Sequence, residues 1–187
     1  MKDKLNLAWV EDAPRIVEEN NDFFYPIANI DSFKDSEGYL DFVTAREHLI
    51  KTHHYDGIIL DDMFLTNDIY PSDGMEAGEH LLCDIRSYDI NKETPVIIYA
   101  TRGMENLIER FKELGANFYL CKHFQILSDD MKQGVYTLNP TKKSLDLKNK
   151  IIAIPKSSEY EIRETAIELM TAEIMLEGMK AMHASSP

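Results

Sequence analysis

The stretch GIILDDMF, residues 57–64, decides the fold of this chain. Residues 58–60 form a short apolar run, and burying each of these side chains is worth about 2 kcal/mol. The run ends at Asp61 and Asp62, and an unpaired carboxylate is costly to bury. The pattern predicts a core strand that leaves the sheet at Asp61, with this carboxylate at the rim of the sheet and not buried in it.

Four further apolar runs and four amphipathic segments surround this strand. The predicted strands cover residues 5–10, 27–33, 57–60, 94–100 and 117–122, and the predicted helices cover residues 13–24, 35–53, 75–88 and 105–115. Short buried strands that alternate with helices predict an α/β fold, a doubly wound five-stranded parallel sheet with helices on both faces. Such sheets bind ligands at the carboxyl ends of their strands.

Charged residues follow three of the predicted strands. Glu11 and Asp12 close the first strand, Asp61 closes the third, and Lys122 ends the fifth. If these three strands are neighbours, their charges meet in one crevice. Close carboxylates repel each other unless a cation joins them, and one lysine is too few for this cluster. Mg²⁺ prefers carboxylate, carbonyl and water oxygens, so the pattern predicts a magnesium site.

Composition excludes several classes of protein. The chain has 187 residues and a formal net charge of −13, which argues against binding nucleic acid through bulk charge. No run approaches the roughly 18 apolar residues of a membrane span, and no secretory signal is seen at the start. Two cysteines form no disulfide framework, which favours reduced thiols in a cytoplasmic protein.

Five motifs give the chain a family resemblance. It resembles the receiver domain of two-component response regulators, which has a flavodoxin-like fold, over about residues 4–124. The motifs occur in the order and at the strands and loops expected for that family: VEDAP (10–14), YDGIILDDM (55–63), SDG (72–74), TPVIIYA (94–100) and GANFYLCKHF (115–124). Each motif alone is weak, but the five together form a strong signal.

The resemblance implies a role for each matching residue. Asp61 corresponds to the phosphoacceptor, Asp12 to the direct Mg²⁺ ligand, and Glu11 to a ligand that acts through water. Met63 corresponds to a residue that gives its backbone carbonyl to the metal. Lys122 corresponds to the lysine that pairs with the acceptor and later with a phosphoryl oxygen. The resemblance also implies a histidine kinase or phosphotransfer protein as donor, and a downstream protein partner.

The chain departs from the family at two switch positions. Ala100 stands where the family has a small hydroxyl residue, so either a bulge brings Thr101 into that place or the switch is weakened. Thr101 is otherwise expected to cap the following helix. Tyr119 matches the switch aromatic, and its hydroxyl partner is the residue in question. His123 replaces the usual proline, so the loop after the lysine takes another path than a cis-proline loop.

The segment between the third strand and the next helix is also unusual. Side chains alternate along a strand, so we expect Asp62 to point away from Asp61, into solvent or toward a loop cap. The loop over residues 64–74 is longer than is usual in the family. We expect this loop either to cover the site or to bind a partner.

The last third of the chain is expected to form an extension, residues 125–187, to a core of residues 1–124. In it, residues 134–138 and 150–154 could pair as a small β excursion. Ser157 or Ser158 then begins a helix of about 25 residues, which is about 37 Å long and overhangs the domain. Its Met-rich second half favours a homodimer or partner contact over a simple packed terminal helix.

Three functions compete at this stage. The first is a phosphorylation-switched receiver that accepts phosphate on Asp61 and is not an enzyme beyond its own phosphorylation and dephosphorylation. The second is a pseudo-receiver, in which Ala100 and His123 disable or weaken the switch. The third is an aspartate-nucleophile phosphatase of the haloacid dehalogenase type, which needs a second acid where this chain has Met63.

Overall fold

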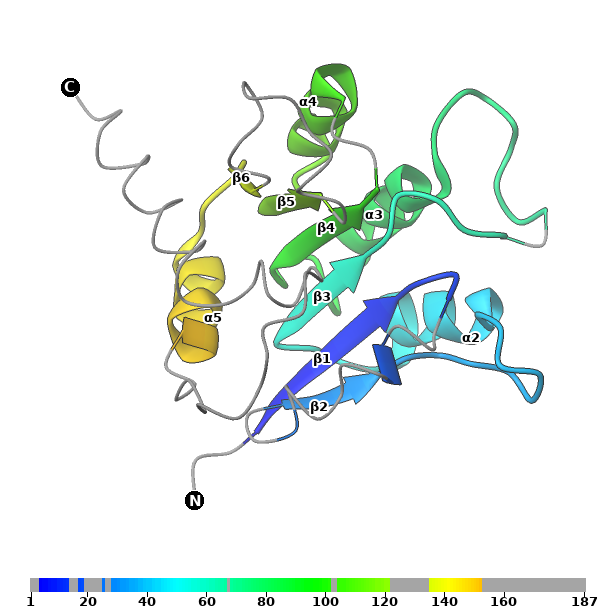
Figure 1. Ribbon diagram of the computed structural model, residues 1–187, viewed down its shortest axis with the longest axis horizontal. Coiled ribbons are helices and arrows are strands. Elements are labelled where there is room, and N and C mark those ends of the chain that lie inside the picture. Colours follow the sequence, from blue (N-terminus) through cyan, green and yellow to red (C-terminus); the bar gives the residue numbers. More distant parts are fainter. Residues whose placement is uncertain are drawn as a thin grey trace.

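The computed structural model describes residues 4–13, 17–18, 25, 28–66, 68–101, 104–121 and 135–152, and the statements below concern these residues. They form one six-stranded sheet in the order β2-β1-β3-β4-β5-β6 (Figure 1). The strands are β1 (Leu5–Val10), β2 (Ala28–Asp31), β3 (Gly57–Leu60), β4 (Val96–Ala100), β5 (Phe118–Cys121) and β6 (Val135–Thr137).

The first five strands are all parallel, so the predicted five-stranded parallel sheet is confirmed. Their order, 2-1-3-4-5, is the doubly wound flavodoxin-like order, and its switch point lies between β1 and β3. The helices are α2 (Phe42–Glu47), a π-helical continuation η1 (His48–Thr52), α3 (Ala77–Ser87), α4 (Glu105–Glu113) and α5 (Lys142–Ile152). No helix within the described ranges is long and apolar enough to cross a membrane.

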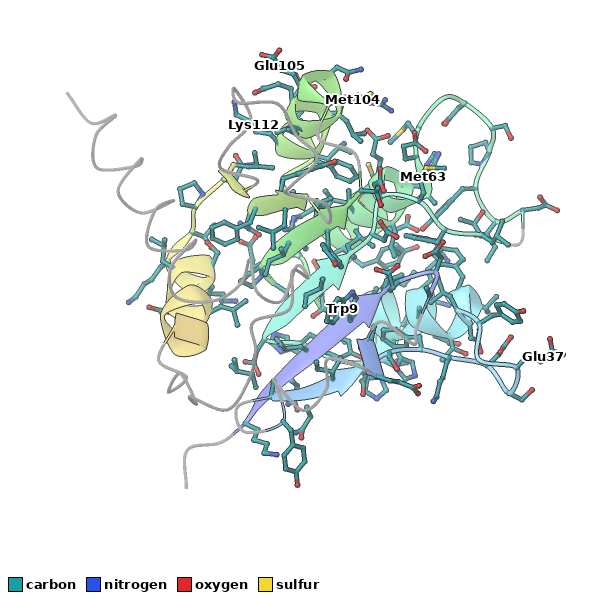
Figure 2. The ribbon with its side chains drawn as sticks, in the orientation of Figure 1. Trp9, Glu37, Met63, Met104, Glu105 and Lys112 are labelled. Atoms are coloured by element: carbon teal, nitrogen blue, oxygen red, sulfur yellow. The ribbon has the colours of Figure 1, made fainter. Side chains whose placement is uncertain are left out.

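Two hydrophobic cores lie on opposite faces of the sheet because side chains alternate along each strand. One core joins Ile58 and Leu60 of β3 to buried residues of α2, α3 and α4. The other joins Ile59 of β3 to Trp9 of β1, which Figure 2 labels, and to Leu147 of α5. Figure 1 shows α5 apart from α2, α3 and α4, on the other side of the sheet. Helices therefore cover both faces, as the strand pattern predicts.

Helix α2 begins later than the sequence predicts. The prediction placed its start at residue 35, but residues 34–40 form a turn closed by a bridge between Lys34 and Leu40. The Asp35 carboxylate accepts bonds from two backbone amides within that turn. Gly38 adopts a φ of 88°, which a helix does not allow. The helix is capped instead by Asp41, whose carboxylate accepts from the Thr44 amide at 3.0 Å.

The predicted pairing of residues 134–138 with 150–154 is wrong. Residues 135–137 form β6, which pairs antiparallel with β5 and extends the main sheet. The side-chain amide of Asn139 donates to the carbonyls of Lys112 and Ala116 at 2.7 and 2.9 Å, which fixes the turn after β6. Residues 142–152 then form α5, so residues 150–152 are helical and are not a strand.

Some predictions lie outside the described residues. These are most of the helix predicted over residues 13–24, of which only 17–18 are described and are helical, and the terminal helix that begins at Ser157 or Ser158. Lys122 and His123 also lie outside them. The division of the chain at residue 124 stays a prediction.

Candidate functional site

The register between β1 and β3 builds the site. Val10 pairs with Leu60, the last residues of the two strands, so the chain leaves both strands at the same level. The Asp61 amide donates to the Val10 carbonyl at 3.0 Å, which ties the two strand ends together. This point is the switch point of the sheet, where doubly wound folds bind ligands. In the sheet order the first and third strands are neighbours, as the predicted site requires. The fifth strand is not adjacent to the third, because β4 lies between them.

Three carboxylates meet at these strand ends. One oxygen from each of Glu11, Asp12 and Asp61 lies within 4.8 Å of the other two. Glu11 is fully buried, whereas Asp12 is exposed. The group is therefore enclosed on the sheet side and reachable from solvent on the Asp12 side. The sequence predicts that these three residues share one crevice, and the structure brings them together.

Asp61 is more buried than the sequence predicts. It follows the last residue of β3 and stands at the rim, but only 4% of it is exposed. One of its carboxylate oxygens accepts from the backbone amide of Asp62 at 2.8 Å. This bond holds one carboxylate oxygen against the main chain. Of the two expectations for Asp62, the position in solvent is wrong, because only 3% of Asp62 is exposed, and the loop cap stays a prediction.

Helix α3 packs directly against the backbone of the two aspartates. The amide of Gly78, in the first turn of α3, donates to the Asp62 carbonyl at 3.0 Å. A Cβ at Gly78 would lie 2.3 Å from the Asp61 carbonyl oxygen, far inside van der Waals contact. Only glycine therefore allows the helix to approach the candidate acceptor this closely. A glycine in the first turn of the helix predicted over residues 75–88 is the only sequence signal that points to this contact.

An ion pair next to Gly78 joins α3 to α4. Glu79 is buried, and its carboxylate accepts from the Arg110 guanidinium at 2.5 Å. The same carboxylate accepts from the Glu76 amide at 2.7 Å and so forms a capping box. Arg110 also donates to the Gly74 carbonyl at 3.1 Å, at the end of the long loop. The sequence patterns did not single out this pair, because residues 31 positions apart carry no local signal.

The other predicted site residues differ in how far they are exposed. Met63 begins the loop after β3 and is half exposed (Figure 2), and its carbonyl as a metal ligand stays a prediction. Ala100 ends β4 and is fully buried. Thr101 is exposed, and Met104 occupies the N-cap position of α4 without a side-chain cap bond, so the prediction that Thr101 caps this helix is wrong. Tyr119 is buried with its ring centroid 5.9 Å from that of Phe111 in α4.

No protein-family model matches the chain, and no curated protein matches it in sequence. Among solved structures it is similar to the receiver domain of the sensor histidine kinase PA1611 from Pseudomonas aeruginosa, with a magnesium ion coordinated in its active-site cleft. That match has 15% identity and a TM-score of 0.49, and it covers 79% of this chain and 95% of that one. The chemotaxis protein CheY4 from Vibrio cholerae is similar at 15% identity and a TM-score of 0.49, covering 69% and 92%.

The response regulator DrrB from Thermotoga maritima is similar at 19% identity and a TM-score of 0.46, covering 64% of this chain. The match spans 46% of the DrrB chain, about half its length. Response regulator receiver domains are thus among the solved structures that this chain is similar to, and they are the family that its sequence resembles.

Proposed function

We propose that this chain is a phosphorylation-switched signalling receiver that accepts a phosphoryl group on Asp61. The observation that carries the proposal is the meeting of Glu11, Asp12 and Asp61 at the ends of two adjacent parallel strands. This is the place where the doubly wound fold binds ligands, and the phosphoacceptor of the family follows its third strand there. The resemblance of the motifs over residues 4–124 supports the same role.

The three carboxylates fit a hard divalent cation, which we propose to be Mg²⁺. Their oxygens are the donors that Mg²⁺ prefers, and three like charges within 4.8 Å favour a cation among them. Asp12 and Asp61 would hold the ion directly, Glu11 would act through water, and Met63 would add its backbone carbonyl. When bound, the ion offsets negative charge on the phosphoryl group during transfer.

The chemistry that we propose for Asp61 is a nucleophilic displacement at phosphorus. One carboxylate oxygen of Asp61 forms the new O–P bond, and the P–N bond to the donor histidine breaks. The electron pair of that bond goes to the imidazole nitrogen of the donor, and an acyl phosphate remains on Asp61. The bond from the Asp62 amide holds one oxygen of Asp61 at 2.8 Å, which restricts how the carboxylate can turn toward phosphorus.

A titration with beryllofluoride in the presence of Mg²⁺ tests this function, because beryllofluoride mimics a phosphoryl group on an aspartate. We expect saturable binding to the wild-type chain, measured by calorimetry or by amide shifts near Asp61. We expect no binding to Asp61→Asn, and unchanged binding to Asp89→Asn, which removes the same charge from an exposed position far along the chain. Binding that survives in Asp61→Asn would disprove the role of Asp61.

A pseudo-receiver is the second candidate, and Ala100 favours it. This buried residue has no hydroxyl to reach a phosphoryl group, and Thr101 beside it is exposed. In a pseudo-receiver the fold would serve as an interaction module with no phosphoryl switch, or with a weak one. The same titration separates the two, because a wild-type chain that binds no better than Asp61→Asn would favour the pseudo-receiver.

Further parts of the proposal follow from the receiver role. The donor would be a histidine kinase, a phosphotransfer protein or a small phosphodonor, and the output would be contact with a downstream protein. Lys122 would pair with the acceptor. The chain would catalyse only its own phosphorylation and dephosphorylation, and it would act in the cytoplasm. The segment that begins at Ser157 or Ser158 would support a homodimer, which sedimentation of a chain shortened after Glu173 would test.

A further inference from the structure

Exposed hydrophobic side chains gather in two segments of the molecule. Eight large hydrophobic residues are exposed among those that the structure describes, and five of them lie in residues 39–43 and 63–69. They are Tyr39, Val43, Met63, Leu65 and Ile69. Leu65 is 85% exposed and Tyr39 is 65% exposed. Single exposed hydrophobic residues are ordinary, but a concentration of them marks an interaction surface.

The two segments lie against each other. The ring of Phe42, at the start of α2, has its centroid 5.3 Å from that of Phe64 and 5.5 Å from that of Tyr70, both in the loop after β3. The Tyr70 hydroxyl donates to the Asp84 carboxylate at 2.7 Å, and the Tyr70 ring stacks on His80 of α3. Figure 1 shows the loop and the turn before α2 on the same side of the molecule.

These contacts give the long loop an inner and an outer side. Phe64 and Tyr70 point inward and anchor it on α2 and α3, whereas Leu65 and Ile69 between them are exposed. The loop is thus held by its own packed aromatic residues, which is typical of loops that carry function. An anchored loop loses little conformational entropy when a partner binds its outer side.

The charge around these residues is mostly negative. The chain has no lysine or arginine between Lys51 and Arg86, a stretch that includes the whole loop. The exposed carboxylates in and next to the two segments are those of Asp35, Glu37, Asp68 and Asp73. The basic residues near the two segments have acidic partners: Lys34 pairs with Glu18, Arg46 with Asp84, and Arg110, at the end of the loop, with Glu79. Asp73 also contacts the His80 ring at 3.0 Å. Hydrophobic side chains therefore stand in an acidic surround.

We propose that Tyr39, Val43, Leu65 and Ile69, with the carboxylates around them, form a docking face for a basic amphipathic segment of a partner protein. Hydrophobic residues of such a segment would cover the exposed side chains, and its lysines or arginines would meet the acidic surround. Like charge disfavours a second copy of the same face. It also disfavours the chain's own residues 157–187, which hold six acidic and two basic residues. The proposal does not rest on phosphoryl acceptance by Asp61.

The test uses the full chain without any phosphoryl mimic. The probe is a fluorescent 14-residue peptide of leucine and lysine at helical spacing, followed by fluorescence anisotropy, and the matched peptide carries glutamate in place of lysine. We expect the lysine peptide to bind at least about tenfold more tightly than the glutamate peptide, with a Kd that rises with salt. Both Leu65 and Ile69 are exposed, so the double variant Leu65→Ser/Ile69→Ser should fold normally.

This double variant should weaken binding of the lysine peptide by about tenfold, since one buried leucine is worth more than 1.4 kcal/mol. The matched control is Tyr88→Ser/Met104→Ser, which removes two exposed hydrophobic residues from outside the face and should change the Kd less than about twofold. Equal losses in both double variants would overturn the proposal. The proposal would also be overturned if peptide binding shifted amide signals elsewhere but not those of residues 39–43 and 63–69. A third contrary result would be a wild-type dimer that Leu65→Ser/Ile69→Ser dissociates while the Kd of the peptide stays the same.

Discussion

The two ends of the sheet handle buried polar groups in opposite ways. At the amino end, Arg86 donates to the carbonyls of Lys92, Thr94 and Gly115, and burial lowers the pKa of its guanidinium. Both the nitrogen and the oxygen of the Asn91 side-chain amide make hydrogen bonds there. At the carboxyl end, three carboxylates crowd within 4.8 Å, and a long loop lies beside them. At the amino end, the side-chain donors of Arg86 and Asn91 meet backbone carbonyls of the chain. At the carboxyl end, three groups of the same charge lie close together.

This difference separates stability from function in the molecule. Matched donors and acceptors stabilise a fold, because an unmatched buried polar group costs about 1–3 kcal/mol. Like charges held close together repel each other, and a ligand of opposite charge would relieve that repulsion. Changes at the amino end should therefore cost stability and leave ligand binding intact. Changes at the carboxyl end should weaken ligand binding and leave stability intact.

Asn91→Leu should have the largest effect on stability. The Asn91 amide donates to the Leu49 and His53 carbonyls at 2.7 and 2.8 Å and accepts from the Tyr55 amide at 3.0 Å. Leucine would leave these buried groups unmatched, so the free energy of unfolding should fall by about 3 kcal/mol or more, measured by urea denaturation. Mg²⁺ affinity should change less than about twofold. A large loss of Mg²⁺ binding in the folded variant would contradict the separation of stability at the amino end from ligand binding at the carboxyl end.

Gly78→Ala should affect both stability and ligand binding, because Gly78 links α3 to the carboxyl end. The new Cβ would meet the Asp61 carbonyl, so α3 must shift, at a cost of about 2 kcal/mol. Beryllofluoride binding should weaken as well, because the backbone of Asp61 moves. The control is Gly38→Ala, where φ is 88° and no atom lies within 4 Å of a Cβ, so the cost is backbone strain of about 1 kcal/mol. Equal binding in the two variants would show that the contact does not position Asp61.

Asp41→Ala sharpens the comparison with a carboxylate that caps a helix and lies outside the cluster. Bonds from the Thr44 amide and the Thr44 hydroxyl lower the pKa of Asp41 below its usual 3.8. Loss of this helix cap should cost about 1 kcal/mol at pH 7. Because the folded pKa is depressed, this stabilisation is present above pH 3.8 and is lost as the pH falls through the folded pKa. The difference in the free energy of unfolding between wild type and variant, measured by urea denaturation, should become smaller in acid. A difference that stays constant with pH would show that the cap is not its source.

Asp12→Asn should have the smallest effect on stability, and in the opposite direction. Removing one of three clustered carboxylates relieves repulsion, so the metal-free chain should gain about 0.5 kcal/mol. Mg²⁺ affinity should fall about tenfold or more, measured by calorimetry. Asp56→Asn would not serve as its control, because Asp56 accepts from the Asn6 amide, but Asp89→Asn is exposed and should change neither quantity. If Asp12→Asn lowered both the free energy of unfolding and the Mg²⁺ affinity, Asp12 would be a residue that stabilises the fold.

Much of the fold could be predicted from the sequence because its strands are short apolar runs with clear ends. Parallel pairing then follows from the helices between them, and parallel pairing brings the strand ends together. The start of α2 could not be predicted this way. Asp35 is as good a helix cap as Asp41, and the turn over residues 34–40, with its Lys34–Leu40 bridge and the positive φ of Gly38, decides which one begins the helix. The pairing of β6 also depends on a strand far away in the sequence.

The carboxylates of the candidate site could be predicted, while the contacts that hold them could not. Asp12 and Asp61 follow strands, and that is a local signal. The contact of Gly78 with the Asp61 backbone depends on how closely α3 approaches β3, which no local pattern contains. The burial of Asp62 was missed for the same reason, since its surroundings come from the start of α3.

Strand β6 and helix α5 have a practical consequence for anyone who would express a shorter version of this molecule. Leu147 of α5 fits against Gly57 so closely that a Cβ there would lie 2.6 Å from its methyl carbon. A chain ended at residue 124 would uncover the side chains of Leu7, Ile59 and Phe118 and would leave the edge of β5 open to strands of other molecules. Such a fragment should aggregate, whereas one ended after residue 152 should stay monodisperse in light scattering.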